Sequence, residues 1–221
     1  MLLRSRATVR TGTCGWRPLN SSGSAIAPQT PGRDALRQLL RARRRALGPA
    51  QRAQAVRAIT RHVAHARWLH GARPIGLYVS VGFEVGTEAL RRLAHQRRCP
   101  VFLPRISDYR ARAMLFARDR HDLSLTNRHG IPEPPIAETL PARSLSVVFL
   151  PLLGFDGSGT RLGSGAGYYD RAFAFRRRRH AWHRPLLVGI AFACQRADHI
   201  ERGPHDVPLD AVVTENGVEY F

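Results

Sequence analysis

The sequence predicts an α/β fold with a mainly parallel sheet of about five to six strands, flanked by helices and preceded by an N-terminal helical pair. Short apolar segments rich in β-branched residues alternate with helical segments along most of the chain. A glycine-rich stretch also separates one apolar segment from a helical one, where ligands bind in open α/β sheets. Parallel strands covered by helices accommodate such an alternation.

The first 32 residues show neither helical nor strand periodicity. They contain several arginines, many Ser, Thr and Gly residues, and no acidic residue. We expect residues 1–32 to be a disordered extension, followed by a single domain over residues 33–221. A mitochondrial transit peptide has this composition, but a mis-assigned start in an arginine-biased genome would look the same and is favoured. The expected location is therefore the cytoplasm, with mitochondria as the alternative.

Two amphipathic helices are predicted between Asp34 and about His70. Apolar residues recur there at steps of three and four among arginines. Gly48 and Pro49 divide the segment, and the second helix is expected to begin at the proline, where a missing N–H costs nothing.

Two strand, loop, helix, strand units follow the helical pair. Their strands are expected at residues 74–80, 101–104, 145–150 and 186–193. Their helices are expected at residues 88–96, with Thr87 as N-cap, and from 168 to about 178. Between the units we expect a hairpin-like excursion at residues 108–116 and an extended turn at residues 129–135, where prolines disfavour helix. A short strand is expected at residues 211–213.

The charge of the chain is strongly positive, with a formal net value of +19 and 35 basic residues. All of these are arginine, which indicates a compositional bias rather than selection for one basic face. The absence of lysine excludes a Walker-type phosphate loop, a Schiff-base enzyme and a protein kinase. A nucleic-acid-binding module is the main alternative to an enzyme. It is disfavoured because the few aromatic residues are not interleaved with the basic clusters.

Cysteine spacing excludes a structural zinc site, and hydropathy excludes a membrane-spanning protein. Cys14, Cys99 and Cys194 are far apart and form no Cys-x-x-Cys cluster, so we expect a reducing compartment and no structural zinc. No apolar run approaches the roughly 18 residues of a membrane span. A soluble protein without a membrane partner is expected.

The segment 156–170 carries the strongest functional pattern. Three of its glycines follow an apolar strand and precede a helix; they are Gly163, Gly165 and Gly167. Backbone N–H groups at such positions can turn toward one anion, and the helix N-terminus adds positive charge. Standing alone, the glycines would fit a flexible surface turn equally well. Arg161 and Asp170 favour a phosphate site, since a guanidinium binds phosphate bidentately and a carboxylate can hold Mg²⁺.

This segment also resembles a known signature. The motif Phe155-Asp-x-x-Gly-x-Arg-Leu-Gly-x-Gly-x-Gly-Tyr-Tyr-Asp-Arg171 is similar to that of the 5-formyltetrahydrofolate cyclo-ligases, or methenyltetrahydrofolate synthetases. The resemblance extends from Arg33 to Glu215. It implies that 5-formyltetrahydrofolate and ATP are converted with Mg²⁺ into 5,10-methenyltetrahydrofolate, ADP and phosphate. Reduced folate and ATP would be the partners of a monomer or weak dimer.

The resemblance also implies site residues. The ATP-binding residues would be Arg33, Arg37, Arg161, Leu162, Gly163, Ser164, Gly165, Ala166 and Gly167, with Arg33 standing where lysine is usual. The substrate-binding residues would be Val79, Glu84, Gly163, Gly165, Gly167 and Tyr168. Asp170 and Asp206 would hold the metal, and the catalytic residues would be Arg161, Tyr168 and Tyr169.

Several of these assignments have alternatives. At least one of Tyr168 and Tyr169 could instead pack in the core. Glu133, in a turn that resembles one beside the family's pterin site, could be structural or could bind ligand. A catalytically silent folate-binding relative is a further alternative, which the intact Arg161, Asp170 and Glu84 disfavour.

Overall fold

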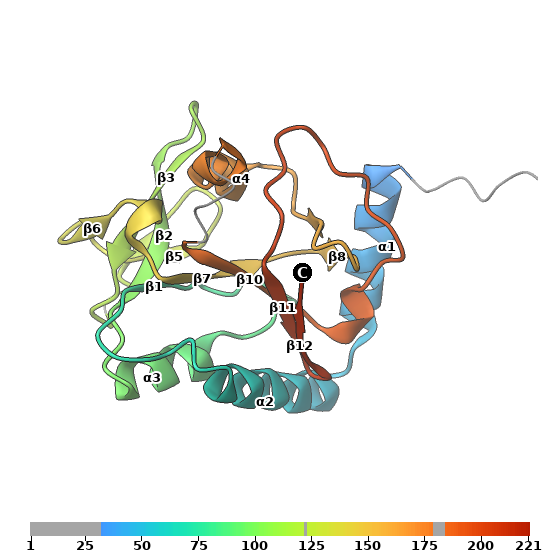
Figure 1. The fold of residues 1–221 in the computed structure, drawn as a ribbon, viewed down its shortest axis with the longest axis horizontal. Coiled ribbons are helices and arrows are strands. Elements are labelled where there is room, and N and C mark those ends of the chain that lie inside the picture. The colour runs from blue at the N-terminus through green and yellow to red at the C-terminus, as the bar shows by residue number, and fades with distance from the viewer. Residues whose placement is uncertain (1–31, 122, 179–183) are drawn as a thin grey trace, which may run out of the picture. The chain divides into compact units, whose positions relative to one another are not determined.

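The computed structural model describes residues 32–121, 123–178 and 184–221 (Figure 1). The predicted N-terminal extension lies outside the described residues except for Gly32, so its disorder and its possible role as a transit peptide stay predictions. The described residues belong to one unit, Pro31–Phe221. Within these ranges, every helix is too short or too polar to span a lipid bilayer.

An eight-stranded sheet forms the centre of this unit, in the order β12-β11-β10-β7-β1-β2-β3-β6. Its strands are β1 (Ile75–Gly76), β2 (Val101–Asp108), β3 (Ala113–Arg118), β6 (Thr139–Leu140), β7 (Val147–Pro151), β10 (Leu186–Ile190), β11 (Ala211–Thr214) and β12 (Gly217–Tyr220). The strands from β11 to β2 pair in parallel, and β12, β3 and β6 extend the two edges in antiparallel fashion. The predicted α/β class is confirmed, although the antiparallel edges raise the strand count above the predicted five to six.

The helices and smaller elements complete the fold. The helices are α1 (Arg33–Ala46), α2 (Pro49–His65), α3 (Glu88–Gln96) and α4 (Tyr168–Ala172). The 3₁₀ turns are η1 (Ala142–Ser144), η2 (Ala174–Arg178) and η3 (Ala193–Gln195). Two small hairpins join β4 (Leu125–Thr126) to β5 (Pro132–Glu133) and β8 (Gly154–Phe155) to β9 (Arg161–Leu162). The helical pair is confirmed, whereas the predicted helix from residue 168 to about 178 is divided into α4 and η2.

The two faces of the sheet are both covered. Along β7, Val147 and Phe149 belong to a core cluster with residues of α2 and α3, while Val148 and Leu150 belong to a second cluster with Phe173, just after α4. Figure 1 shows α2 and α3 below the sheet and α4 above it. Side chains alternate along a strand, so a strand with apolar residues at every position must be buried on both faces.

Helix α1 packs away from the sheet, against the β8–β9 hairpin. Its buried Leu36 and Leu40 form a third core cluster with Leu162 of β9 and Ile200. A Cβ at Gly154 of β8 would clash with the side chain of Leu40, so only glycine allows this approach. The packing presents the neighbouring face of α1 to the segment that follows β9.

Candidate active site

The candidate site lies at the carboxyl ends of the parallel strands. The segment after β7 carries the β8–β9 hairpin and the glycine loop (residues 163–167), the segment after β1 carries Glu84, and the segment after β10 carries Asp206. Parallel strands run in one direction, so the segments that follow them emerge on the same edge of the sheet. The fold therefore gathers residues that are far apart in the sequence.

Two buried polar side chains fix the segment that leads into the glycine loop. The Asp156 carboxylate accepts hydrogen bonds from the N–H groups of Ser158 (2.9 Å), Thr160 (3.1 Å) and Ile200 (2.8 Å), and from the Ser158 hydroxyl (2.7 Å). Burial alone would raise the pKa of Asp156, but these hydrogen bonds lower it below its ordinary value. Gln195 Nε2 donates to the carbonyl oxygen of Leu152 at 2.7 Å.

The three loop glycines have different backbone requirements. Gly165 has φ +107° and Gly167 has φ +74°, a region that side chains with a Cβ rarely adopt. Gly163 has no positive φ, and a Cβ there would meet nothing closer than 3.8 Å. Gly165 and Gly167 therefore decide the path of the loop, and Gly167 directly precedes α4.

Arg161 and Asp170 form an ion pair across the glycine loop. The Nη2–Oδ1 distance is 2.5 Å, and Arg161 is 5% exposed. Asp170 Oδ1 also accepts a hydrogen bond from the Val207 N–H at 3.1 Å. Arg161 Nε is buried and has no hydrogen-bond partner among the described residues. An unpartnered buried N–H is costly, so this guanidinium retains binding capacity for an acceptor.

Arg33 and Asp206 form a second ion pair, between α1 and the segment after β10. Their Nη1–Oδ2 distance is 2.7 Å, and the Gly203 N–H donates to the same oxygen at 2.9 Å. Burial would raise the pKa of Asp206, but the hydrogen bonds from Arg33 and Gly203, together with the charges of Arg33 and Arg161, lower it. Asp206 is therefore held ionised beside the Arg161–Asp170 pair.

Arg37 lies one helical turn after Arg33 and contacts the glycine loop directly. Its Nε donates to the carbonyl oxygen of Gly163 at 3.2 Å, and its guanidinium also pairs with Asp34. A Cβ at Gly165 would lie 3.9 Å from the Arg37 guanidinium. Residues four apart share a helix face, so Arg37 reaches the glycine loop from the same face of α1 on which Arg33 reaches Asp206.

Glu84 lies in a separate part of this edge and is half-buried. Its Oε2 accepts a hydrogen bond from the Val81 N–H at 3.1 Å, and the Thr87 hydroxyl ties the same segment to the Tyr78 carbonyl oxygen at 2.7 Å. Burial raises the pKa of Glu84, and the Val81 hydrogen bond and the charge of Arg44 only partly offset this. Thr87 occupies the predicted N-cap position of α3, but its hydroxyl does not cap the helix.

The two tyrosines after the glycine loop differ in their surroundings. Tyr169 packs partly against the second core cluster, as the alternative of core packing requires for one of the pair. Burial raises the pKa of Tyr169, with a further rise from the negative charge of Glu84. Glu84 and Tyr169 are thus close enough to interact electrostatically, which links the segment after β1 to the glycine loop. Tyr168 is half-buried, and Val79 packs against the first core cluster.

Comparison with known proteins decides the family. A sequence model of the 5-formyltetrahydrofolate cyclo-ligase family matches residues 29–215. The chain belongs to this family. The family resemblance that the motif around the glycine loop indicated is confirmed.

Individual relatives agree with this assignment. The chain is 32% identical over 185 residues to a 5-formyltetrahydrofolate cyclo-ligase of Haemophilus influenzae, covering 81% of the chain and 96% of the relative. It is 33% identical over 186 residues to that of Escherichia coli K12, covering 81% and 98%. These relatives are named as enzymes, and the chain is a member of an enzyme family.

Solved structures support the fold of the cyclo-ligase family. The 5,10-methenyltetrahydrofolate synthetase of Aquifex aeolicus superposes with a TM-score of 0.70 at 24% identity, covering 85% of this chain and 92% of that one. The corresponding protein of Mycoplasma pneumoniae gives a TM-score of 0.65 at 21% identity, covering 84% and 99%. At these identities the likeness concerns the fold alone.

Two arginines at this edge were not singled out from the sequence. Arg44 is half-buried, places its charge near Glu84, and has an Nε without a hydrogen-bond partner in the described part of the chain. Arg112, in the β2–β3 turn, donates to the Ala166 carbonyl oxygen of the glycine loop at 3.2 Å. Arg112 does not stand out in a chain whose basic residues are all arginine. Arg44 belongs to the basic helix segment that resembles the family's, but the sequence assigns it no role of its own.

Asp170 and Asp206 fit a magnesium ion by the nature of their donor atoms. Over the described ranges, no group of three or more His, Cys, Asp or Glu side chains forms a metal site. Mg²⁺ is nevertheless often bound by only one or two carboxylates together with waters and substrate phosphates. Val207, whose N–H donates to Asp170, directly follows Asp206 in the sequence. Asp170 therefore lies next to the segment that carries Asp206.

The Glu133 carboxylate binds other groups of the protein. Its Oε1 accepts hydrogen bonds from the Ile106 N–H at 3.1 Å and from Asn127 Nδ2 at 2.9 Å, and the residue is 5% exposed. Asp210 likewise pairs with Arg176 at 2.6 Å and accepts from the Leu187 N–H at 2.7 Å. These contacts support a structural role for both acids.

Proposed function

We propose that this protein converts 5-formyltetrahydrofolate and ATP, with Mg²⁺, into 5,10-methenyltetrahydrofolate, ADP and phosphate. The observation that supports the proposal is the convergence of the glycine loop, the arginines of α1 and the Arg161–Asp170 pair at one edge of the sheet. Arginines and loop amides suit a triphosphate, since charge-assisted hydrogen bonds to phosphate are among the strongest in proteins. Glu84, on the neighbouring segment, supplies a carboxylate for a heterocycle with N–H donors.

The need for ATP follows from the chemistry of the formyl group. A formamide carbon is a poor electrophile, and its oxygen is a poor leaving group. In the proposed reaction the formyl oxygen attacks the γ-phosphorus and the bond to ADP breaks, giving a phosphorylated imidate. N10 then adds to the activated carbon and loses its proton, and phosphate leaves with the former formyl oxygen. Positioning and charge neutralisation provide most of the catalysis in such phosphoryl transfers.

The arginines have distinct proposed roles in this reaction. Arg37, which contacts the glycine loop, and Arg33, which pairs with Asp206, would cover the triphosphate. Arg161, oriented by Asp170, faces the γ-phosphate and offers its unpartnered Nε as a further donor. Asp170 and Asp206 would hold Mg²⁺, which supplies positive charge to the phosphate oxygens when bound.

The remaining contacts concern the folate. Glu84 would accept hydrogen bonds from the pterin ring, and Val79 would line the same pocket. Tyr168 is proposed to contact the formyl group. The pKa of Tyr169 is raised, so its hydroxyl keeps its proton in the neutral range, where it can donate or accept a hydrogen bond while the ring packs against a neighbour.

The decisive experiment follows the absorbance of methenyltetrahydrofolate after the purified full chain is mixed with 5-formyltetrahydrofolate, Mg²⁺ and ATP. Growth of this band is expected, with matched reactions that omit ATP or Mg²⁺ remaining flat. Folded protein that gives no signal in the complete mixture would reject the proposed function. Activity without ATP would reject the proposed phosphorylation step.

Location and assembly also stay proposals. We propose a cytoplasmic protein that acts as a monomer or weak dimer, in keeping with small-molecule substrates. Size-exclusion chromatography with light scattering tests the assembly, and a stable tetramer or larger species would contradict it.

A further inference from the structure

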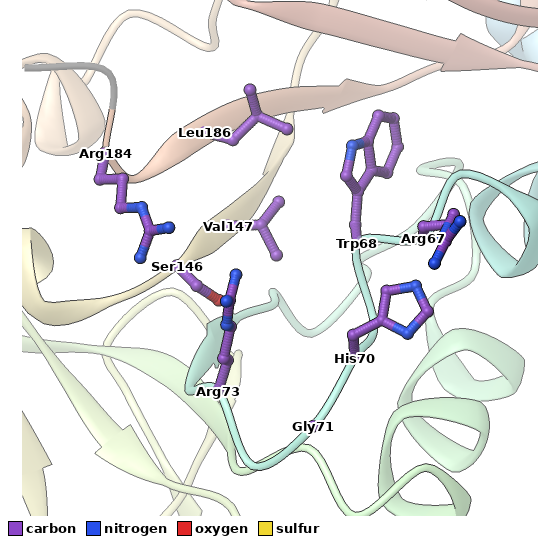
Figure 2. Close-up of a pocket in the computed structure, with 9 residues that line it drawn as sticks. All are labelled: Arg67, Trp68, His70, Gly71, Arg73, Ser146, Val147, Arg184 and Leu186. Atoms are coloured by element: carbon purple, nitrogen blue, oxygen red, sulfur yellow. The ribbon is translucent and has the colours of Figure 1, made fainter.

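A basic pocket lies at the amino ends of the parallel strands, opposite the carboxyl ends that carry the candidate active site. Its cavity measures about 540 Å³ and is lined by residues just before β1, β7 and β10 (Figure 2). Arg73 precedes β1, Ser146 precedes β7, and Arg184 precedes β10. The glycine loop follows β7, so the two sites are separated by the length of the strands. The pocket volume falls within the roughly 300–1,000 Å³ of small-molecule sites.

The rim of this pocket is held by the backbone of the strand starts. The N–H and the hydroxyl of Ser146 both donate to the Pro74 carbonyl oxygen at 2.8 Å, and the Leu186 N–H donates to the Ser146 carbonyl oxygen at 3.0 Å. These bonds join the beginnings of β1, β7 and β10. The pocket wall is therefore part of the sheet framework, which favours a preformed site.

In the part of the chain that the structure describes, the arginines of this pocket have no acidic partner. Within residues 32–121, 123–178 and 184–221, no acidic side chain lies within 4.0 Å of Arg67, Arg73 or Arg184, and none of the three guanidiniums donates a hydrogen bond. Figure 2 shows Arg73 and Arg184 approaching the Ser146 end of the pocket from opposite sides. Like charges held around one cavity repel each other, and a bound anion would relieve that repulsion.

The rest of the lining combines an apolar wall with Arg67, His70 and Gly71. In Figure 2, Val147 and Leu186 lie between the indole of Trp68 and the side chains of Arg73 and Arg184. Trp68 is held by ring contacts to Phe149 and Tyr220, each with a centroid separation of 6.1 Å. A fixed indole beside two aliphatic side chains forms a surface suited to a flat ring.

We propose that this pocket binds a small amphipathic anion, with a phosphate or carboxylate group joined to a flat apolar ring. Arg73 and Arg184 contact the anionic group, since guanidiniums match both phosphate and carboxylate oxygens. Trp68, Val147 and Leu186 contact the ring. The inference uses no residue of the candidate active site and does not depend on the proposed function.

Calorimetric titration of the full chain with phenyl phosphate and, separately, with benzoate tests this at about 0.15 M ionic strength. The test variant is Arg73→Ala/Arg184→Ala. Its matched control is Arg57→Ala/Arg61→Ala, which removes two exposed arginines of α2 and the same charge. We expect at least one of the two ligands to bind the wild type and the control variant with equal affinity. The same ligand should bind the test variant at least about tenfold more weakly, since at least one bidentate contact is lost. The tighter ligand identifies the anionic group.

A turnover assay, a replacement variant and a third ligand complete the test. Turnover in the methenyltetrahydrofolate assay is expected to be the same for the test variant and the wild type, which separates this pocket from the active site. If the double variant does not fold, Arg73→Gln takes its place. Equal affinities in test and control variants, or binding of neither ligand to the wild type, would overturn the proposal. Inorganic phosphate binding as tightly as phenyl phosphate would overturn the role of the flat ring.

Discussion

Arginines lie at both ends of the parallel strands, the carboxyl edge and the amino edge. They differ in whether an acidic side chain pairs with them. At the carboxyl edge, Arg161 is paired with Asp170 and Arg33 with Asp206, and both pairs are at least partly buried. At the amino edge, Arg73 and Arg184 surround a cavity without an acidic partner in the described part of the chain. A paired guanidinium is oriented before its ligand arrives, whereas an unpaired one offers its full charge with less definite direction. The net charge of the chain shows neither which arginines are paired nor how they are oriented.

Removing Arg161 should have the largest effect. Arg161→Ala deletes a buried cation and leaves Asp170 without its partner, so we expect turnover to fall about 10²- to 10³-fold, the range seen when one electrostatic donor is removed. Steady-state kinetics checks this, with Arg57→Ala as a control for charge and circular dichroism as a check on folding. A loss no greater than about threefold would remove Arg161 from the proposed mechanism.

The glycine loop can be tested within itself. Gly165→Ala forces a Cβ residue to φ +107°, which should cost about 1–3 kcal/mol and lower kcat/KM about tenfold as the loop shifts. Gly163→Ala is the matched variant, since neither backbone conformation nor space opposes a methyl group there, and its loss should be smaller. Equal losses in the two variants would show that loop conformation is not the limiting factor.

Glu84 should make the binding of folate depend on pH. Its pKa is raised, so if only the ionised form binds folate, affinity should fall about tenfold per pH unit below that raised value. A carboxyl with a raised folded pKa also stabilises the fold at low pH and loses this contribution as pH rises through that value. Glu84→Gln should flatten the binding profile and raise the unfolding midpoint on the alkaline side. Titrations of 5-formyltetrahydrofolate across pH measure the first effect, and an unchanged profile would contradict it.

The unpaired arginines should matter least for stability. Arg73 is exposed and has no ion pair to lose, so Arg73→Ala should change the free energy of unfolding by no more than about 0.5 kcal/mol without added anion. Urea unfolding in low salt measures this. Arg176→Ala is the comparison, because Arg176 pairs with Asp210 and donates to the Pro185 carbonyl oxygen. If Arg73→Ala were the more destabilising of the two, the contrast between the sheet edges would be wrong.

Much of the fold could be predicted from local patterns. The helical pair, its break at Pro49, the hairpin around residues 108–116 and the strand at 211–213 all depend on the spacing of apolar residues or on proline geometry. The extents of the elements were less predictable. The strand expected at residues 74–80 is reduced to Ile75–Gly76, and the helix after the glycine loop ends at Ala172, where the next residue, Phe173, is fully buried.

The candidate site could be predicted in part. The glycine loop and its neighbours Arg161 and Asp170 are close in the sequence, so their pattern was visible without a structure. Asp156 and Gln195 were not recognised as supports of the loop, because their partners are backbone groups that no side-chain pattern reports. Arg112 could not be told from the other arginines, and Arg44 could be placed only in the basic segment of the first helix, without a role.

The sequence by itself determined the α/β class, the position of the glycine loop and the family signature, because each depends on residues near one another along the chain. Only the tertiary structure decided which arginines are neutralised and which are left free. Arg33 meets a partner 173 positions away in Asp206, while Arg73 and Arg184 come together at strand starts that are far apart in sequence. Charge pairing depends on distance in space, and in a chain without lysine every cation looks alike until the fold places it.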